Sequence, residues 1–264
     1  MFSKFFRKKT KIGLALGGGV ARGIAHLGVL KAFEKHHIPI DYISGVSSGS
    51  LVGALYAAGL EVDYMIKILK KLKWFDFAGL RLDKKGFVSS APMKSFIEKE
   101  VGDIKLKDLK IPFVSLATDV LTGHSVELID PDLRLADVIA ASTAFPGFFA
   151  PVKIKHQWLV DGGTSHIVAP SVLKRKNMDF VVAVNVIPKV MLDKLPANFV
   201  SIADRSLDLM FLRIAGFTKK SADLFLQPVT EYVGSFEIDK ASLLVEMGEK
   251  CVEAHLDKIQ KVLR

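Results

Sequence analysis

The chain has 264 residues, enough for one large domain or two small ones, and half of them are hydrophobic. Its net charge of +9, from 37 basic and 28 acidic residues, points to nucleic acid or an anionic membrane as a partner, but no nucleic-acid-binding motif is present. No apolar run is long enough to cross a membrane, and the single cysteine, Cys251, excludes an internal disulfide and a cysteine-based metal site.

The N-terminal segment is basic and then apolar, like the start of a signal peptide. The apolar part leads directly into three glycines and Arg22 without a cleavage site, so we expect a cytoplasmic protein. Phe2, Phe5 and Phe6 lie among basic residues, which favours a membrane interface, and a solvated extension is the alternative. We predict a basic tail over residues 1–10 and a single domain over 11–264.

The first elements follow the order strand, loop, helix, strand, turn, helix, which is typical of a parallel α/β sheet. We predict strands over 11–16 and 42–43 and helices over 24–35 and 50–58. Between the second strand and the second helix, Gly45-Val46-Ser47-Ser48-Gly49 fits the G-x-S-x-G pattern of a nucleophile elbow. Ser47 is therefore the candidate nucleophile, and an ordinary glycine-rich turn is the competing interpretation.

The glycine loop over 17–23 does not fit a nucleotide site. The spacing of its glycines misses the dinucleotide fingerprint, and Gly23 is followed by Ile24 rather than by the lysine of a phosphate-binding loop. A glycine loop at a helix N-terminus presents backbone N–H groups to an anion. If a parallel sheet brings this loop beside Ser47, it forms an oxyanion hole for acyl transfer.

The remaining chain alternates helices and strands without repeats. We predict an amphipathic helix over 61–73, followed by Trp74, Phe75 and Phe77 as a lid or a lipid-facing loop. Further predicted helices span 91–101, 135–142, 204–220 and 241–263, and predicted strands span 111–119, 125–129 (a hairpin pair), 153–160 and 180–187.

The base that would activate Ser47 is not fixed by these patterns. Asp161 ends a predicted strand and precedes two glycines, which is a common site position in α/β folds and also an ordinary turn. His166 and His255 follow the serine in the order that an α/β-hydrolase requires, but only one strand precedes the elbow here. Spacing alone leaves the base open.

Four stretches in this order resemble the bacterial patatin-like phospholipase family: 17–23, 45–49, 141–152 and 161–163. The resemblance implies a three-layer α/β/α sandwich with a mostly parallel central sheet. It implies a Ser-Asp dyad, with Ser47 as nucleophile and Asp161 as general base and acid, and an oxyanion hole from the amides of Gly18, Gly19 and Val20. We add the Ser48 amide, which follows the nucleophile.

Two positions depart from the family pattern. Val20 stands where the family often has a fourth glycine, and a β-branched residue does not easily adopt a positive φ. His166 stands where the family commonly has asparagine.

From these residues we expect a lipid acyl hydrolase of the phospholipase A or lysophospholipase type that works through an acyl-enzyme. A thioesterase, a small-ester esterase and a non-catalytic lipid-binding regulator are the alternatives. We expect no metal and no cofactor. The expected substrate is a phospholipid or another fatty-acyl ester, and an anionic inner membrane face is the candidate docking partner.

Overall fold

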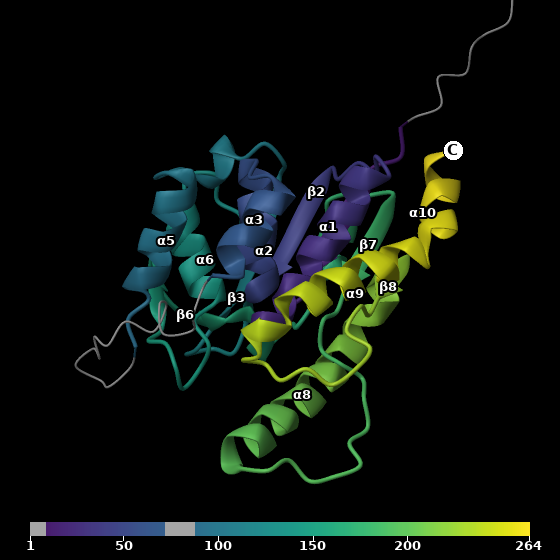
Figure 1. Cartoon of the computed structure of the whole chain (residues 1–264). Coiled ribbons are helices and arrows are strands. Elements are labelled where there is room, and N and C mark those ends of the chain that lie inside the picture. The colour runs from purple at the N-terminus through teal and green to yellow at the C-terminus, as the bar shows by residue number, and fades with distance from the viewer. Residues whose placement is uncertain (1–8, 72–87) are drawn as a thin grey trace, which may run out of the picture.

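The computed structural model describes residues 9–71 and 88–264. In this part of the chain, eight strands form one sheet in the order β5-β6-β3-β2-β1-β7-β8, and β4 pairs with β3 outside this path (Figure 1). The strands are β1 (Ile12–Leu16), β2 (Tyr42–Val46), β3 (Phe113–Asp119), β4 (Ser125–Leu128), β5 (Val152–Ile154), β6 (Gln157–Asp161), β7 (Phe180–Val184) and β8 (Leu224–Leu226).

The centre of the sheet is parallel, and one side is antiparallel. Strands β3, β2, β1, β7 and β8 run parallel in that order, whereas β4 and β6 pair with β3 in the antiparallel sense and β5 pairs likewise with β6. Leu16 of β1 lies opposite Gly45 of β2. Because parallel strands end at the same edge, the glycine loop after β1 and the turn after β2 are neighbours, as the sequence predicts.

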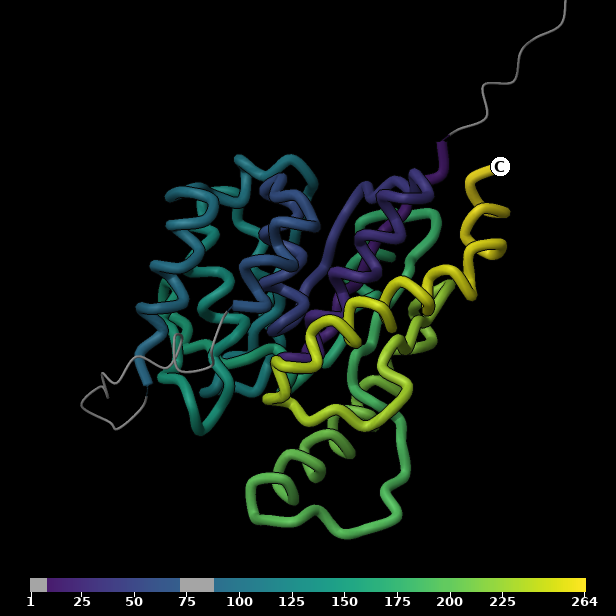
Figure 2. The backbone as a smooth tube through the Cα atoms, viewed as in Figure 1, coloured from purple at the N-terminus to yellow at the C-terminus, as the bar shows by residue number. Residues whose placement is uncertain are grey.

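Helices cover both faces of the sheet. They are α1 (Ala25–Lys35), α2 (Ser48–Ala58), α3 (Val62–Leu69), α5 (Ala91–Val101), α6 (Leu135–Ser142), α7 (Pro170–Arg175), α8 (Phe199–Thr218), α9 (Ala241–Glu253) and α10 (Leu256–Leu263). The tube in Figure 2 shows α9 crossing in front of α1, and α8 extending from the lower end of the molecule.

Alternate residues of strand β1 pack on opposite faces of the sheet. Ile12, Leu14 and Leu16 of β1 pack into the core with α1, α2 and α9. Ala15 packs on the opposite face, with Leu173 of α7 and the inner side of α8. This two-residue alternation places the sheet between two helical layers and confirms the predicted α/β/α sandwich.

Three element predictions need correction. The predicted strand 153–160 is a hairpin, β5 and β6, because Lys155 adopts a left-handed conformation at φ +54° and turns the chain. Helix α8 begins before residue 204, since Asn198 and Ser201 cap its first turn reciprocally. The predicted helix 241–263 is divided into α9 and α10 at His255, whose ring lies 2.8 Å from the carbonyl oxygen of Cys251. Strand β8 was not predicted.

Some predictions cannot be compared with this structure. Residues 1–8 of the basic tail and Trp74, Phe75 and Phe77 lie outside the described residues.

Other element predictions are confirmed. They are the hairpin of β3 with β4 and the helices over 91–101 and 135–142.

Helices α1 and α9 meet at two glycines. A Cβ at Gly28 would overlap the backbone of Val245, and one at Gly248 would overlap the carbonyl of Ala25. The two backbones therefore approach too closely for any larger residue, and this contact joins α9 to the first α/β unit.

We predict that Gly28→Ala lowers the free energy of unfolding by about 1–3 kcal/mol, since the added methyl forces the two helices apart. Urea denaturation measures the change. Gly216→Ala is the matched control, because a methyl group at Gly216 in α8 would meet nothing within 4 Å, and alanine is the better helix former. Equal stability of Gly28→Ala and the wild type would contradict the close contact.

Candidate active site

Ser47 occupies a strained turn between β2 and α2. Its φ of +51° and ψ of −122° are unusual for a residue with a side chain. A Cβ at Gly45 would press on the backbone of Ser50, and one at Gly49 would overlap the carbonyl of Leu16. Only glycine at these two positions allows the strand and the helix to pack this closely on either side of the turn. The turn places Ser47 immediately before the first residue of α2.

Ser142 fixes this turn from behind. Its hydroxyl accepts the Ser47 backbone N–H at 3.0 Å and donates to the carbonyl of Leu116 at 2.7 Å. Ser142 is fully buried at the end of α6, and its bond to the Leu116 carbonyl is buried as well. The hydroxyl therefore links the turn at Ser47 to strand β3.

Asp161 is the hydrogen-bond acceptor for the Ser47 hydroxyl. The hydroxyl donates to Oδ2 of Asp161 at 2.6 Å, and the backbone N–H of Gly163 donates to Oδ1 at 2.7 Å. Asp161 is 2% exposed. Burial raises the pKa of Asp161 from 3.8 to about 6, although the hydrogen bonds from Ser47 and Gly163 oppose this rise. A carboxylate with such a pKa is ionised at neutral pH and is a better proton acceptor than an exposed one.

The glycine loop lies against Ser47. A Cβ at Gly18 would come within 3.1 Å of the Ser47 Cβ. The Gly18 amide, however, donates to the carbonyl of Ile167 at 2.8 Å and is not free for an oxyanion, which corrects the prediction for this residue. Within the described residues, the amides of Gly19 and Val20 donate to no protein acceptor.

Val20 adopts the conformation that its β-branched side chain disfavours. Its φ is +56°, in the left-handed region, so the fourth position of the loop keeps a glycine-like backbone without glycine. The expectation that valine avoids a positive φ is therefore wrong here. The surrounding loop imposes the conformation.

Arg22 anchors the loop to a distant helix. Its guanidinium is fully buried and donates to both carboxylate oxygens of Asp208 in α8, at 2.6 and 2.9 Å, and to the carbonyl of Val233 at 2.6 Å. Burial raises the pKa of Asp208, and the hydrogen bond from Arg22 opposes that rise. This bidentate pair gives the loop and α8 a fixed relative position.

No described histidine forms a hydrogen bond with Ser47 or Asp161, although the ring of the buried His26 lies 2.8 Å from the carbonyl oxygen of Gly17 in the glycine loop. Among the described residues, no histidine lines either of the two pockets that meet at Ser47. Burial and the nearby Arg175 cation lower the pKa of His166, and the Glu127 carboxylate opposes this change. His255 contacts the carbonyl of Cys251 in the C-terminal helices. Asp161 is thus the titratable group that contacts the serine hydroxyl.

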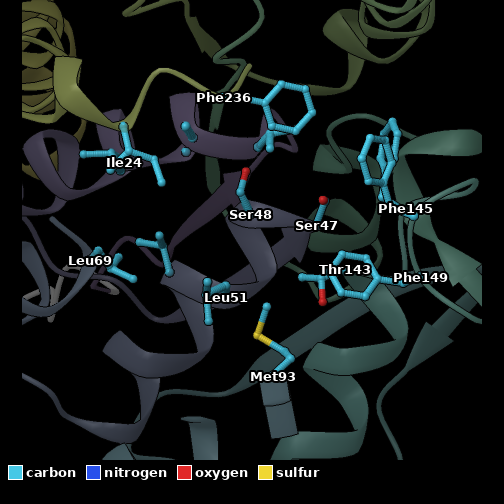
Figure 3. A pocket seen from close by; sticks show the side chains of 16 residues that line it. Ile24, Ser47, Ser48, Leu51, Leu69, Met93, Thr143, Phe145, Phe149 and Phe236 are labelled. Carbon is cyan, nitrogen blue, oxygen red and sulfur yellow. The ribbon is translucent and has the colours of Figure 1, made fainter. Parts of the chain in front are cut away.

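An apolar pocket opens beside the serine (Figure 3). Figure 3 shows the Ser47 hydroxyl directed into it, with Leu51 and Met93 on one side and Phe145 and Phe236 on the other. The lining comes from the glycine loop, α2, α3, α5 and the segment after α6. A smaller pocket on the other side of Ser47 is lined by Gly19, Asp161, Asp208 and Phe211, among others.

The part of the chain that the structure describes contains no cluster of three or more histidine, cysteine or carboxylate residues that could hold a metal ion. Within the same residues, no helix is long and apolar enough to span a membrane.

The fold places the protein in the α/β class. The model of the patatin-like phospholipase family matches residues 14–170, and the chain belongs to this family. An uncharacterized NTE family protein of Mycobacterium tuberculosis is 32% identical over 177 residues, which are 66% of this chain and 49% of that protein. Lysophospholipase NTE1 of Eremothecium gossypii is 33% identical over 66% of this chain and 12% of its own length. The match thus spans about half of the length of the mycobacterial relative and a smaller part of the length of the fungal one.

Solved structures share the fold at low identity. VipD from Legionella pneumophila has a TM-score of 0.54 and 14% identity, covering 96% of this chain and 67% of its own. Human GIVD cytosolic phospholipase A2 has a TM-score of 0.55 and 13% identity, covering 97% of this chain and 59% of its own.

The sequence does not indicate two of the side-chain contacts in this site. Ser142 belongs to the stretch 141–152, but nothing in that stretch indicates that its hydroxyl contacts the Ser47 amide. Asp208 gave no signal, because a single acid in an amphipathic helix normally faces solvent.

We predict that Ser142→Ala reduces kcat for a soluble p-nitrophenyl ester about tenfold or more with little change in KM, because the turn at Ser47 loses its support. The two unpaired backbone groups also lower the free energy of unfolding by about 1–3 kcal/mol.

Ser44→Ala is the matched control. Ser44 lies on the strand that leads into the turn, is buried, and donates to the carbonyl of Ala169 at 3.1 Å. Its loss should lower stability comparably and leave kcat near the wild-type value. Equal kcat for the two variants would show that Ser142 has only a structural role.

Proposed function

We propose that the protein is a lipid acyl hydrolase in which Ser47 is the nucleophile and Asp161 is the general base and acid. The observation that carries this proposal is the 2.6 Å hydrogen bond from the Ser47 hydroxyl to the buried Asp161 carboxylate, at the edge of an apolar pocket. A serine hydroxyl becomes a useful nucleophile when a positioned base takes its proton.

The reaction begins when Ser47 Oγ attacks the ester carbonyl carbon and its proton passes to Asp161 Oδ2. The tetrahedral oxyanion accepts hydrogen bonds from the amides of Gly19, Val20 and Ser48. Asp161 then returns the proton to the leaving alkoxide oxygen, and the acyl group stays on Ser47. Asp161 next takes a proton from water, whose oxygen attacks the acyl carbon of the acyl-enzyme. The bond to Ser47 Oγ then breaks, Asp161 returns the proton to Oγ, and the carboxylic acid is released.

The apolar pocket supports a fatty-acyl substrate. Leu51, Leu69, Met93, Phe149 and Ile238 provide an apolar lining next to the serine, and burial of each methylene of an acyl chain contributes about 0.8 kcal/mol. The family, and relatives described as lysophospholipase and neuropathy target esterase, support a phospholipid or lysophospholipid of the phospholipase A type. In this proposal the protein acts from an anionic membrane surface to which it binds peripherally.

We predict that Ser47→Ala and Asp161→Asn each reduce hydrolysis of mixed phospholipids by at least about a thousandfold, since the two residues act as one unit. Mass spectrometry of the released fatty acids and lysolipids measures the loss and identifies the bond that is cleaved. Thioesters and short-chain esters in the same panel separate a thioesterase or a small-ester esterase from a lipid hydrolase.

Asp119→Asn is the control for the aspartate substitution. Asp119 is also buried, and its carboxylate accepts the backbone N–H of Leu121 away from both pockets. It should retain most activity. Near-wild-type hydrolysis by Asp161→Asn would contradict the dyad.

The raised pKa of Asp161 predicts a pH dependence. For the free enzyme, kcat/KM should fall about tenfold per pH unit below a midpoint near 6, since the protonated acid cannot act as the base. Stability has the opposite dependence. Because the native pKa exceeds the unfolded one, ionising Asp161 destabilises the fold as pH rises through about 6.

The melting temperature of Asp161→Asn should therefore exceed that of the wild type by more at pH 7.5 than at pH 5. Thermal unfolding at the two pH values measures this difference without any substrate. A kcat/KM midpoint near 4, or an equal stability difference at both pH values, would contradict a buried base.

A further inference from the structure

Helix α8 and the segment before it carry an unusual density of exposed apolar side chains. Among the described residues, eight of the fourteen large apolar side chains that are exposed fall between residues 191 and 217, so the exposure is concentrated rather than scattered. They are Met191, Leu195, Phe199, Val200, Ile202, Leu209, Met210 and Phe217.

Five of these residues form one stripe along α8, here called the α8 face: Phe199, Ile202, Leu209, Met210 and Phe217. They recur at intervals of about three and about seven or eight residues, which places them on one side of a helix. Phe199 is 83% exposed and Phe217 is 85% exposed, so both ends of the stripe are open to solvent.

The opposite side of α8 faces the body of the protein. Asp204 and Asp208 contact Arg22, Phe211 lines the smaller pocket, and Ala215 is buried in the core. In an ordinary surface helix the apolar side faces the protein and the charged side faces solvent. In α8 the two acids Asp204 and Asp208 face the protein, and an apolar stripe faces solvent. Packing within the described part of the chain leaves the outer side uncovered.

The charges around the α8 face are mostly positive. Residues 189–220 hold three acids, and two of these, Asp204 and Asp208, are turned toward Arg22. Asp193 is the third. The exposed basic residues of the segment are Lys189, Lys194, Arg213, Lys219 and Lys220. An apolar stripe with basic flanks is complementary to an anionic lipid surface.

The α8 face also lies close to the candidate active site. The inner side of α8 contributes Asp208 and Phe211 to the pocket that contains Ser47 and Asp161, and one helix is only about 10 Å across. Phe148 and Phe236, which line the apolar pocket, are 51% and 40% exposed at its opening. Exposed apolar side chains thus occur both on α8 and around the opening.

We propose that the α8 face is the surface by which the protein docks on an anionic lipid bilayer. This deepens the proposed function and rests on it, because docking beside the pocket would let an acyl chain pass from the bilayer to Ser47. The Arg22–Asp208 pair joins the docked helix rigidly to the glycine loop.

A second copy of the chain fits this face less well. In a two-fold contact the stripe would meet itself, which would place the flanking basic residues near basic residues of the other copy. Like charges brought together at an interface oppose association. An anionic bilayer meets both the apolar and the basic residues favourably.

The test measures sedimentation of the full chain with vesicles, in a Ser47→Ala background so that no lipid is consumed. The triple variant Phe199→Ser, Met210→Ser and Phe217→Ser should bind vesicles of phosphatidylglycerol and phosphatidylcholine at least about tenfold more weakly. The matched triple variant with leucine at these positions should bind like the parent. With Ser47 intact, both triple variants should hydrolyse a soluble short-chain ester normally.

Charge is tested separately. Arg213→Gln with Lys220→Gln should weaken binding to the anionic vesicles about tenfold or more and leave binding to pure phosphatidylcholine vesicles unchanged. Lys99→Gln with Lys261→Gln, on α5 and α10, removes the same charge and should have little effect.

Unchanged vesicle binding by the serine triple variant would overturn the proposal. So would a wild-type dimer, measured by light scattering, that dissociates in this variant, because a second copy would then cover the face. If the α8 substitutions abolish docking but the wild type hydrolyses no lipid ester, docking stands and the proposed function fails.

Discussion

The hydrogen bond between the Ser47 hydroxyl and the Asp161 carboxylate joins two residues that are 114 positions apart in the sequence. For this bond to form, the turn at Ser47 and the end of strand β6 must lie side by side. Ser47 follows a central parallel strand, whereas Asp161 ends a strand that runs antiparallel to β3. The mixed sheet is what brings them together. Burying a carboxylate costs free energy, and the N–H of Gly163 and the Ser47 hydroxyl offset part of that cost.

Around this bond, backbone packing leaves little freedom. Gly49 lies against the carbonyl of Leu16, Gly18 lies against Ser47 and donates to Ile167, and Val20 is held in a left-handed conformation. These constraints fix the glycine loop relative to the serine before any substrate binds. A site built in this way is preorganised, which is the property that stabilises a developing oxyanion most effectively.

The segment after residue 170 lies beyond the part of the chain that matches the family model, yet it contributes to the site. Asp208 of α8 and the carbonyl of Val233 hold Arg22, and Phe211 lines the smaller pocket. The same helix presents its apolar side to solvent. Arg22 therefore couples the loop beside Ser47 to the surface that we propose meets the bilayer.

Local sequence patterns were sufficient to predict the features of the site that lie within one short segment of the chain. The strand–turn–helix at Ser47 follows from Gly45 and Gly49, and the position of Asp161 follows from its resemblance to a known motif. The sequence did not indicate that the Gly18 amide bonds to Ile167, that Ser142 supports the Ser47 amide, or that Asp208 meets Arg22. Each of these contacts joins segments far apart in the chain, so no periodicity or turn signal encodes it.

Reaction with a fluorophosphonate, followed by peptide mapping, tests the proposed dyad of Ser47 and Asp161 most directly. Labelling at Ser47 in the wild type, much slower in Asp161→Asn, is the predicted result. Labelling of another serine, or an equal rate in both proteins, would contradict it.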